Sequence, residues 1–197
     1  GIRKRLLEYD DVMNSQREVI YTRRRHALYG EQIEIDLNNI MCDFAESFME
    51  SHEGMDYESF TFELIREVAL HPTFDEATYN AAKPKEIVEL IVKDLHELYA
   101  RRGKAAADTV RTTMEKIYED NKHLMDRVIH FPLTDGHLGF HVPVELQKCK
   151  DTDCAEIYKV FAKIVMFTTI DDAWREHLRE MDELRHSVQN ATYEQKD

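Results

Sequence analysis

The chain has 197 residues, of which 43% are hydrophobic and 33% charged, so it can bury a core as one domain or two small ones. Only six glycines and four prolines favour long helices over a sheet-rich fold, and no apolar run approaches the roughly 20 residues that span a bilayer. The formal net charge of −13 argues against nucleic acid as the main partner, because phosphate groups would be repelled.

The first predicted element is one helix over residues 2–29. A seven-residue apolar row of this kind is typical of a helix that packs along a partner helix. The row is already in phase at residue 2 without a convincing N-cap, so we expect the chain to start inside a longer helix. The row consists of Leu6, Met13, Ile20 and Ala27.

The basic stretch "TRRRHALYG", residues 22–30, has two interpretations. Cations favour the negative C-terminal end of a helix, and Gly30 would cap that end. The alternative is a basic patch for an acidic partner. We prefer the helix end, because it accounts for both the position of the cations and the glycine.

The middle of the chain predicts further helices separated by short loops. Residues 33–52 and about 57–70 form two of them, and residues 71–84 form a polar loop with prolines near both ends. Pro84 suits the first turn of the next helix, and Gly103 either ends that helix or lies inside a longer one. The apolar stripe of the first of these helices consists of Ile33, Leu37, Ile40, Met41, Phe44 and Phe48.

Residues 127–144 depart from the helical pattern and predict a small β-hairpin. Asp135-Gly136 is a strong signal for a two-residue turn. Pairing across that turn places apolar residues opposite one another on a single face, as a half-buried hairpin requires. The predicted pairs are Leu133 with Leu138, Phe131 with Phe140 and Ile129 with Val142.

From about residue 153 to 189 a second long helix is predicted, and it also carries a seven-residue apolar row. Two such helices at the ends of the chain are expected to pack as an antiparallel pair, with the middle region inserted between them. Trp174 is predicted to be a central packing residue of that pair. The row consists of Val160, Phe167, Trp174, Met181 and Val188.

This last helix also carries many carboxylates and imidazoles between residues 166 and 186, which suggests either a metal or acid–base site or a solvated helix face. A di-iron bundle needs two Glu-x-x-His pairs that face each other, and the sequence has one, Glu183 to His186. Because Trp174, Leu178 and Met181 define the buried side, we interpret the acidic side as solvated.

A zinc site near the hairpin is the alternative that we keep open. The predicted pairing sets His130 opposite His141 with His137 on the same side, and Cys149 and Cys154 follow closely. These are acceptable zinc ligands, but the close Cys-x-x-Cys spacing of common zinc folds is missing. The alternative function is therefore a zinc-stabilised helical protein-binding module.

An odd cysteine count without a disulfide framework suits a reducing cytosol.

No self-contained active site is visible in the sequence. The Gly-x4-Gly-Lys-Ser/Thr phosphate loop and the Gly-x-Ser-x-Gly nucleophile elbow are both absent. We therefore predict no catalytic residue, no cofactor-binding residue and no enzyme activity in this chain.

Two strings in the sequence resemble a known family. "RKRLLEYDDVMNSQREVIYTRRRHAL", residues 3–28, resembles the long scaffold helix of the SecA family of preprotein translocation motors. "TIDDAWREHLREMDELRHSVQNATYEQKD", residues 169–197, resembles the first helix and tip of the two-helix finger of SecA. The order and separation of the two strings also match that family, with the residues between them in place of the helical wing.

The resemblance implies a mainly α fold: long antiparallel scaffold helices, an inserted helical wing domain and one small β-hairpin. Its implied divisions are a first scaffold helix at 1–30, a wing at 31–152 and the second scaffold helix with the start of the finger at 153–197. It further implies a non-catalytic part of a motor whose ATP and Mg sites lie in other domains. The implied partners are those domains, the SecYEG channel and unfolded preproteins, at the cytoplasmic face of the plasma membrane without spanning it.

The resemblance also aligns Tyr193 with the tyrosine at the tip of the SecA finger, where it would contact preprotein. The surrounding residues depart from the family. Many SecA sequences carry Gly-Ile-x-Leu-Arg-Gly-Tyr, whereas this chain reads "SVQNATY" at 187–193. The arginine and the second glycine are therefore missing beside the aligned tyrosine.

Overall fold

In a computed structural model of the chain, the structure describes residues 2–29, 33–134 and 139–194, without the side chains of residues 2, 3, 28 and 188–194. The chain divides into two compact units. The first comprises residues 1–31 and 160–197, and the second comprises residues 32–159. We describe each unit by itself.

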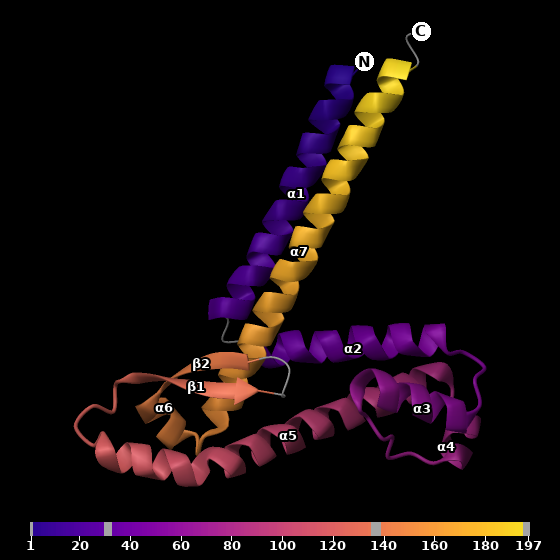
Figure 1. Ribbon diagram of the computed structural model, residues 1–197. Coiled ribbons are helices and arrows are strands. Elements are labelled where there is room, and N and C mark those ends of the chain that lie inside the picture. Colours follow the sequence, from indigo (N-terminus) through magenta and orange to yellow (C-terminus); the bar gives the residue numbers. More distant parts are fainter. Residues whose placement is uncertain (1, 30–32, 135–138, 195–197) are drawn as a thin grey trace. The chain divides into compact units, whose positions relative to one another are not determined.

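The first unit is a pair of long helices. Helix α1 spans Ile2–Tyr29, and helix α7 spans Ala155–Glu194, with its residues from 160 onward in this unit. The two helices lie side by side and run in opposite directions (Figure 1). Helix α1 has the predicted bounds, whereas α7 continues five residues past the predicted end at 189.

The second unit begins with three helices that pack with the first half of a fourth. Helix α2 spans Ile33–Ser51, α3 spans Tyr57–Val68, α4 spans Glu76–Ala81 and α5 spans Pro84–Asp120. Short polar caps set these boundaries. The N-cap carboxylates of Asp56 and Asp75 accept hydrogen bonds from the backbone N–H groups of Ser59 and Thr78, at 3.0 and 2.9 Å.

One apolar core joins these four helices. Its centre is fully shielded, since Phe60, Leu64 and Ile91 are 0% exposed. One carboxylate is buried near this core: Asp94 is 2% exposed and accepts hydrogen bonds from the backbone N–H and the hydroxyl of Thr73, at 2.7 and 2.6 Å. The buried core residues are Ala45, Phe48, Met49, Phe60, Leu64, Leu70, Phe74, Ile87, Ile91, Leu95 and Leu98.

Three expectations for this part need correction or completion. The predicted loop at 71–84 contains helix α4. Asp75 caps this short helix, which lies between the two prolines of the segment. Ile40, predicted on the apolar stripe of α2, is 50% exposed because it lies at the edge of that stripe. Gly103 lies inside α5, which is one continuous helix of 37 residues.

The second half of the unit contains the predicted β-hairpin, with β1 at Val128–Thr134 and β2 at Gly139–Glu145. Its register differs by two residues from the predicted one: Leu133 pairs with Phe140, Phe131 with Val142 and Ile129 with Val144. A shift of two keeps every side chain on its face, so the apolar pattern alone cannot detect it. The observed register brings Val144, which is 1% exposed, into the paired face.

Helix α6, Leu146–Asp151, follows the hairpin directly and was not predicted. Its first two backbone N–H groups donate to the carbonyls of Arg127 and Met125, at 3.0 and 2.8 Å, which ties it to the segment before β1. Between α6 and α7, Asp153 and Cys154 both adopt left-handed backbone conformations, with φ of 50° and 68°. Two consecutive non-glycine residues in this region require a well-anchored turn.

Candidate functional site

The predicted apolar rows of α1 and α7 lie on the shielded sides of their helices. Met13 is 8% exposed and Ala27 is 3% exposed, and they are the buried residues among the described side chains of α1. The other row residues with described burial are half-buried. These are Leu6 and Ile20 on α1, and Val160, Phe167, Trp174 and Met181 on α7.

Polar side chains also connect the two helices. Arg24 Nε lies 2.7 Å from one carboxylate oxygen of Asp171, and its Nη2 lies 3.3 Å from the other. The same guanidinium lies 5.2 Å from the centre of the Phe167 ring. Further along, His177 Nε2 and Gln16 Oε1 form a hydrogen bond of 2.8 Å.

These contacts define how the two helices are aligned. An apolar row that repeats every seven residues packs almost equally well after a shift of one heptad, so apolar contact alone leaves the alignment open. A shift of one heptad separates Arg24 from Asp171 and His177 from Gln16. A half-buried pair that loses its partner is left with unmatched polar groups, which disfavours the shifted arrangements. We call these four residues the polar key.

Two shallow grooves flank the seam, with volumes of about 440 and 410 Å³. Trp174 lines the first beside Ile20, and its ring stacks on His177 with 5.6 Å between centroids. Trp174, predicted as a central packing residue of the pair, is half-buried and borders this open groove, so it packs along the seam without being enclosed.

The remaining acidic residues of α7 form an exposed face. Arg179 pairs with Glu176 one turn before it and lies 3.5 Å from Glu183 one turn after it, while Arg175 lies 3.1 Å from Asp172. The Arg179 guanidinium lowers the pKa of the Glu176 carboxyl below its usual value. These are ordinary ion pairs along a solvated helix surface.

Sequence reasoning did not identify the polar key. Asp171 and His177 were grouped with the solvated carboxylates and imidazoles, yet both face α1. Arg24 was assigned to a basic helix end, yet it pairs across the seam. The only available signal was position: Gln16 interrupts the apolar row that contains Tyr9, and a polar residue in such a row often specifies helix alignment.

The described residues of the zinc alternative do not form a group with metal-compatible spacing. His141 is exposed on β2, whereas Cys149 and Cys154 are buried, and His137 lies outside the described residues. His130 pairs with Pro143 rather than with His141. Within the described ranges, the one group of three residues with metal-compatible spacing is His52, Glu63 and Glu67, and Glu63 there already pairs with Arg66 at 2.5 Å.

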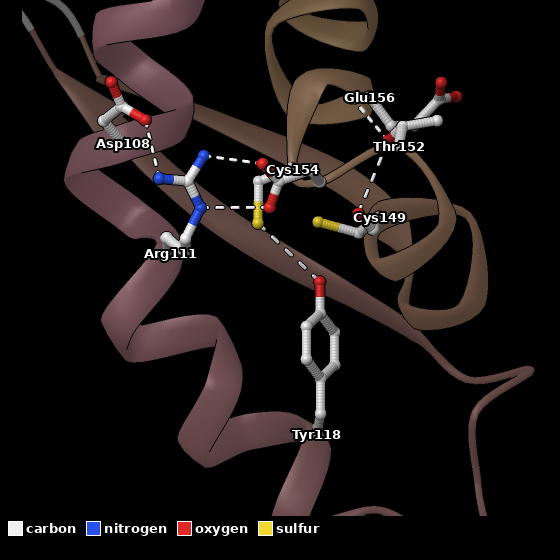
Figure 2. Close-up of polar contacts among 8 residues, drawn as sticks. Asp108, Arg111, Tyr118, Cys149, Thr152, Cys154 and Glu156 are labelled. Atoms are coloured by element: carbon white, nitrogen blue, oxygen red, sulfur yellow. Dashed lines mark hydrogen bonds and ion pairs between the residues drawn. The ribbon is translucent and has the colours of Figure 1, made fainter.

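The two cysteines instead belong to a polar cluster at the turn between α6 and α7, shown in Figure 2. The Tyr118 hydroxyl lies 3.7 Å from Cys154 Sγ, and burial raises the pKa of Tyr118. Burial also raises the pKa of the Cys149 thiol to about 12, so it remains protonated and unreactive at neutral pH.

Next to the thiols, Arg111 anchors the strained turn. Its Nε and Nη2 donate to the two carboxylate oxygens of Asp153 at 3.0 and 2.7 Å, and its Nη1 donates to Asp108 at 2.7 Å (Figure 2). A planar guanidinium that binds one carboxylate with two nitrogens fixes both distance and orientation. This cluster therefore holds the left-handed residues in place, and its chemistry is structural.

A family model described as SecA Wing and Scaffold domain matches residues 1–197, the whole chain. The chain belongs to the SecA family. The resemblance of its two end segments to SecA and its predicted mainly α fold are both confirmed.

Several curated relatives of this family match the full chain, and each is named Protein translocase subunit SecA. The relative from Parabacteroides distasonis is 46% identical over 197 residues. Those from Azobacteroides pseudotrichonymphae and Porphyromonas gingivalis are 43% and 40% identical over 198 residues. The chain spans 17% of the length of the first relative and 18% of the other two. No solved structure matches.

Tyr193 falls within the bounds of α7, but its side chain lies outside the described residues. Within the described part of the chain, no helix is both long and apolar enough to cross a membrane.

Proposed function

We propose that this chain is a non-catalytic mechanical part of a SecA motor that uses ATP to move unfolded preproteins through the SecYEG channel. Family membership supports the motor, and the polar key supports the mechanical role. In this proposal, the ATP and Mg sites lie in other domains of the motor, and this chain binds no cofactor. The motor would work at the cytoplasmic face of the plasma membrane as a peripheral protein.

The two compact units fit the two roles in the family name. The helix pair would be the scaffold, with residues 1–30 as its first helix and residues 153–197 as its second helix and the start of the finger. Residues 31–152 would be the wing. The unit boundaries, between residues 31 and 32 and between 159 and 160, support this division.

The mechanical argument rests on the polar key. Two helices that are aligned by apolar rows alone can slip by a heptad under load. Arg24 bound to Asp171 and His177 bound to Gln16 oppose such slippage at two separate points. A displacement applied to one helix is then passed to the other instead of being lost in sliding.

The test is a charge exchange in the complete SecA protein that contains this chain. Arg24→Asp and Asp171→Arg each place like charges together, so we expect preprotein translocation to fall several-fold while basal ATP hydrolysis persists. The double exchange restores opposite charges, and we expect it to recover much of the lost translocation. Measuring translocation per ATP hydrolysed separates transmission from catalysis.

The matched control is Arg175→Asp, which removes an exposed ion pair on the same helix and should leave translocation unchanged. The proposal fails if both single exchanges translocate like the parent protein. It also fails if the double exchange is as impaired as the singles, because the defect would then not come from the pairing.

The non-catalytic part of the proposal has its own test. The isolated chain is expected not to hydrolyse ATP, because its sequence has no phosphate-binding loop. Turnover that copurifies with the chain through successive columns would contradict this.

Tyr193 is proposed to contact preprotein at the finger tip. An aromatic ring in a polar segment can contact many apolar side chains without demanding a particular sequence. In the complete motor, we expect Tyr193→Asp to impair translocation and Tyr193→Phe to be better tolerated. Wild-type translocation by the Tyr193→Asp variant would remove this role.

A further inference from the structure

An acidic groove with an apolar floor lies between the second half of α2 and the first turns of α5. Its volume is about 510 Å³. The exposed side chains of Glu46, Glu50 and Glu89 line it, together with Met49 and Val88. Both helices belong to the second unit, so the groove is formed within one compact part of the chain.

The three groove carboxylates form no ion pair with any described residue of the chain. Across residues 33–134 and 139–194, no ion pair involves Glu46, Glu50 or Glu89. Lys85 also lines the groove, but it is one cation beside three carboxylates. The wider segment is similarly unbalanced, since residues 33–82 contain twelve Asp or Glu and one Arg or Lys.

The helix geometry adds to this negative charge. Helix α2 ends at Ser51, so its C-terminal carbonyl groups lie close to Glu50, and its last turn contains no basic residue. Cations normally stabilise such a helix end, and Glu46 and Glu50 are one turn apart, where like charges repel each other. His52 Nδ1 lies 2.8 Å from the carbonyl oxygen of Phe48 at this helix end, but among the described residues no ion pair offsets the repulsion between the carboxylates, which favours a cation supplied from outside.

The floor of the groove restricts what kind of cation fits. Met49 is 8% exposed and forms an apolar base with the half-buried Val88. A hydrated small ion gains nothing from this surface. A lysine or arginine can lay its methylene groups on apolar side chains while its charged end reaches carboxylates, and methionine adapts to different shapes.

We propose that this groove binds a basic segment of a partner protein, in which lysine or arginine side chains are interspersed with apolar ones. The charge complementarity of the three carboxylates selects the basic residues, and the Met49 and Val88 floor selects the apolar ones. This site is separate from the helix pair, so its test is independent of the proposed mechanical function.

The test uses the complete chain and a fluorescein-labelled 12-residue peptide of alternating lysine and leucine, with binding followed by fluorescence anisotropy. The variant is Glu46→Gln/Glu50→Gln/Glu89→Gln, which keeps side-chain shape and removes three charges. We expect it to weaken binding at least tenfold. The matched control, Glu67→Gln/Glu115→Gln/Glu119→Gln, removes three exposed carboxylates elsewhere in the same unit and should change binding less than twofold.

Two further ligands test the floor. A lysine–serine peptide of the same length and spermine, a polycation without apolar side chains, should each bind at least tenfold more weakly than the lysine–leucine peptide. Backbone amide shifts in NMR spectra should change around residues 46–50 and 84–89 when that peptide is added. Circular dichroism confirms that both triple variants are folded.

Three results would overturn the proposal. The first is equal loss of binding in the two triple variants, which would indicate general charge attraction. The second is spermine or the lysine–serine peptide binding as tightly as the lysine–leucine peptide. The third is binding of the lysine–leucine peptide with amide shifts confined to residues outside the groove.

Discussion

The two units of the chain hold their helices together in different ways. In the second unit, four helices pack around one shared apolar core, and side chains such as Phe60, Leu64 and Ile91 are fully enclosed. In the first unit, two helices share a narrow seam, and of its described side chains only Met13, Ala27 and Ala162 are buried. Two cylinders in contact cannot enclose a large side chain, so this pair relies on half-buried rows for adhesion and on polar contacts for alignment.

The largest expected effect is in the enclosed core. Leu64→Ala removes a side chain that is 0% exposed and leaves a cavity among α2, α3 and α5. We expect a loss of about 3–5 kcal/mol in the free energy of unfolding. Denaturant titration with hydrogen exchange measures this, and the loss of amide protection should centre on α3 and its neighbours. A loss below about 1 kcal/mol would mean that this core is loosely packed.

Trp174→Ala tests the packing of the helix pair in the first unit. Truncation of an enclosed aromatic residue to alanine lowers the free energy of unfolding by about 3–5 kcal/mol, but Trp174 borders an open groove and is half-buried. We therefore expect about 2 kcal/mol, with loss of amide protection in α1 and α7. A loss as large as that of Leu64→Ala would show that the seam is enclosed like a core. An unchanged melting temperature would show that Trp174 is fully exposed.

The polar key should contribute less to the free energy of unfolding than Leu64 or Trp174. A double-mutant cycle with Arg24→Gln and Asp171→Asn isolates the coupling between two side chains that are 31% and 23% exposed. We expect a coupling of about 1 kcal/mol, because the pair is partly screened by solvent. Additive losses, with no coupling, would mean that this contact does not align the helices.

The smallest expected effect is on the acidic face of α7. Glu176→Gln should change the melting temperature by less than about 1 °C, because the ion pair that it removes is exposed. The lowered pKa of Glu176 means that its pairing contributes above the usual carboxyl pKa and is lost as the pH falls through the lowered value. A large change at neutral pH would indicate that Glu176 belongs to a buried site.

Periodicity predicted the long elements well, because a helix is defined by residues that are close in sequence. The row from Leu6 to Ala27 was sufficient to place α1, and the alternating apolar residues were sufficient to place the hairpin. The hairpin register was wrong because a shift of two residues preserves the face of every side chain. The burial of Val144 on the paired face distinguishes the observed register from the predicted one.

The partners across the seam could not be predicted from sequence. Arg24 and Asp171 are 147 residues apart, and nothing local to either residue identifies the other. Helix α6 was missed for a related reason: six residues are too few for an apolar period, and its position depends on bonds to Arg127 and Met125. Contacts between distant segments therefore needed the structure.

The glycine inside α5 has a consequence for how this family varies. A β-carbon at Gly103 would lie 3.0 Å from Cδ1 of Tyr158, closer than carbon atoms normally approach. Glycine in a helix interior lowers helix stability by about 1 kcal/mol relative to alanine. Substitution of Gly103 by alanine should therefore be favoured unless the tyrosine ring opposes it. Positions 103 and 158 are therefore expected to co-vary among homologues. Where evolution places alanine or a larger residue at 103, it should also have replaced the ring at 158 by a smaller side chain.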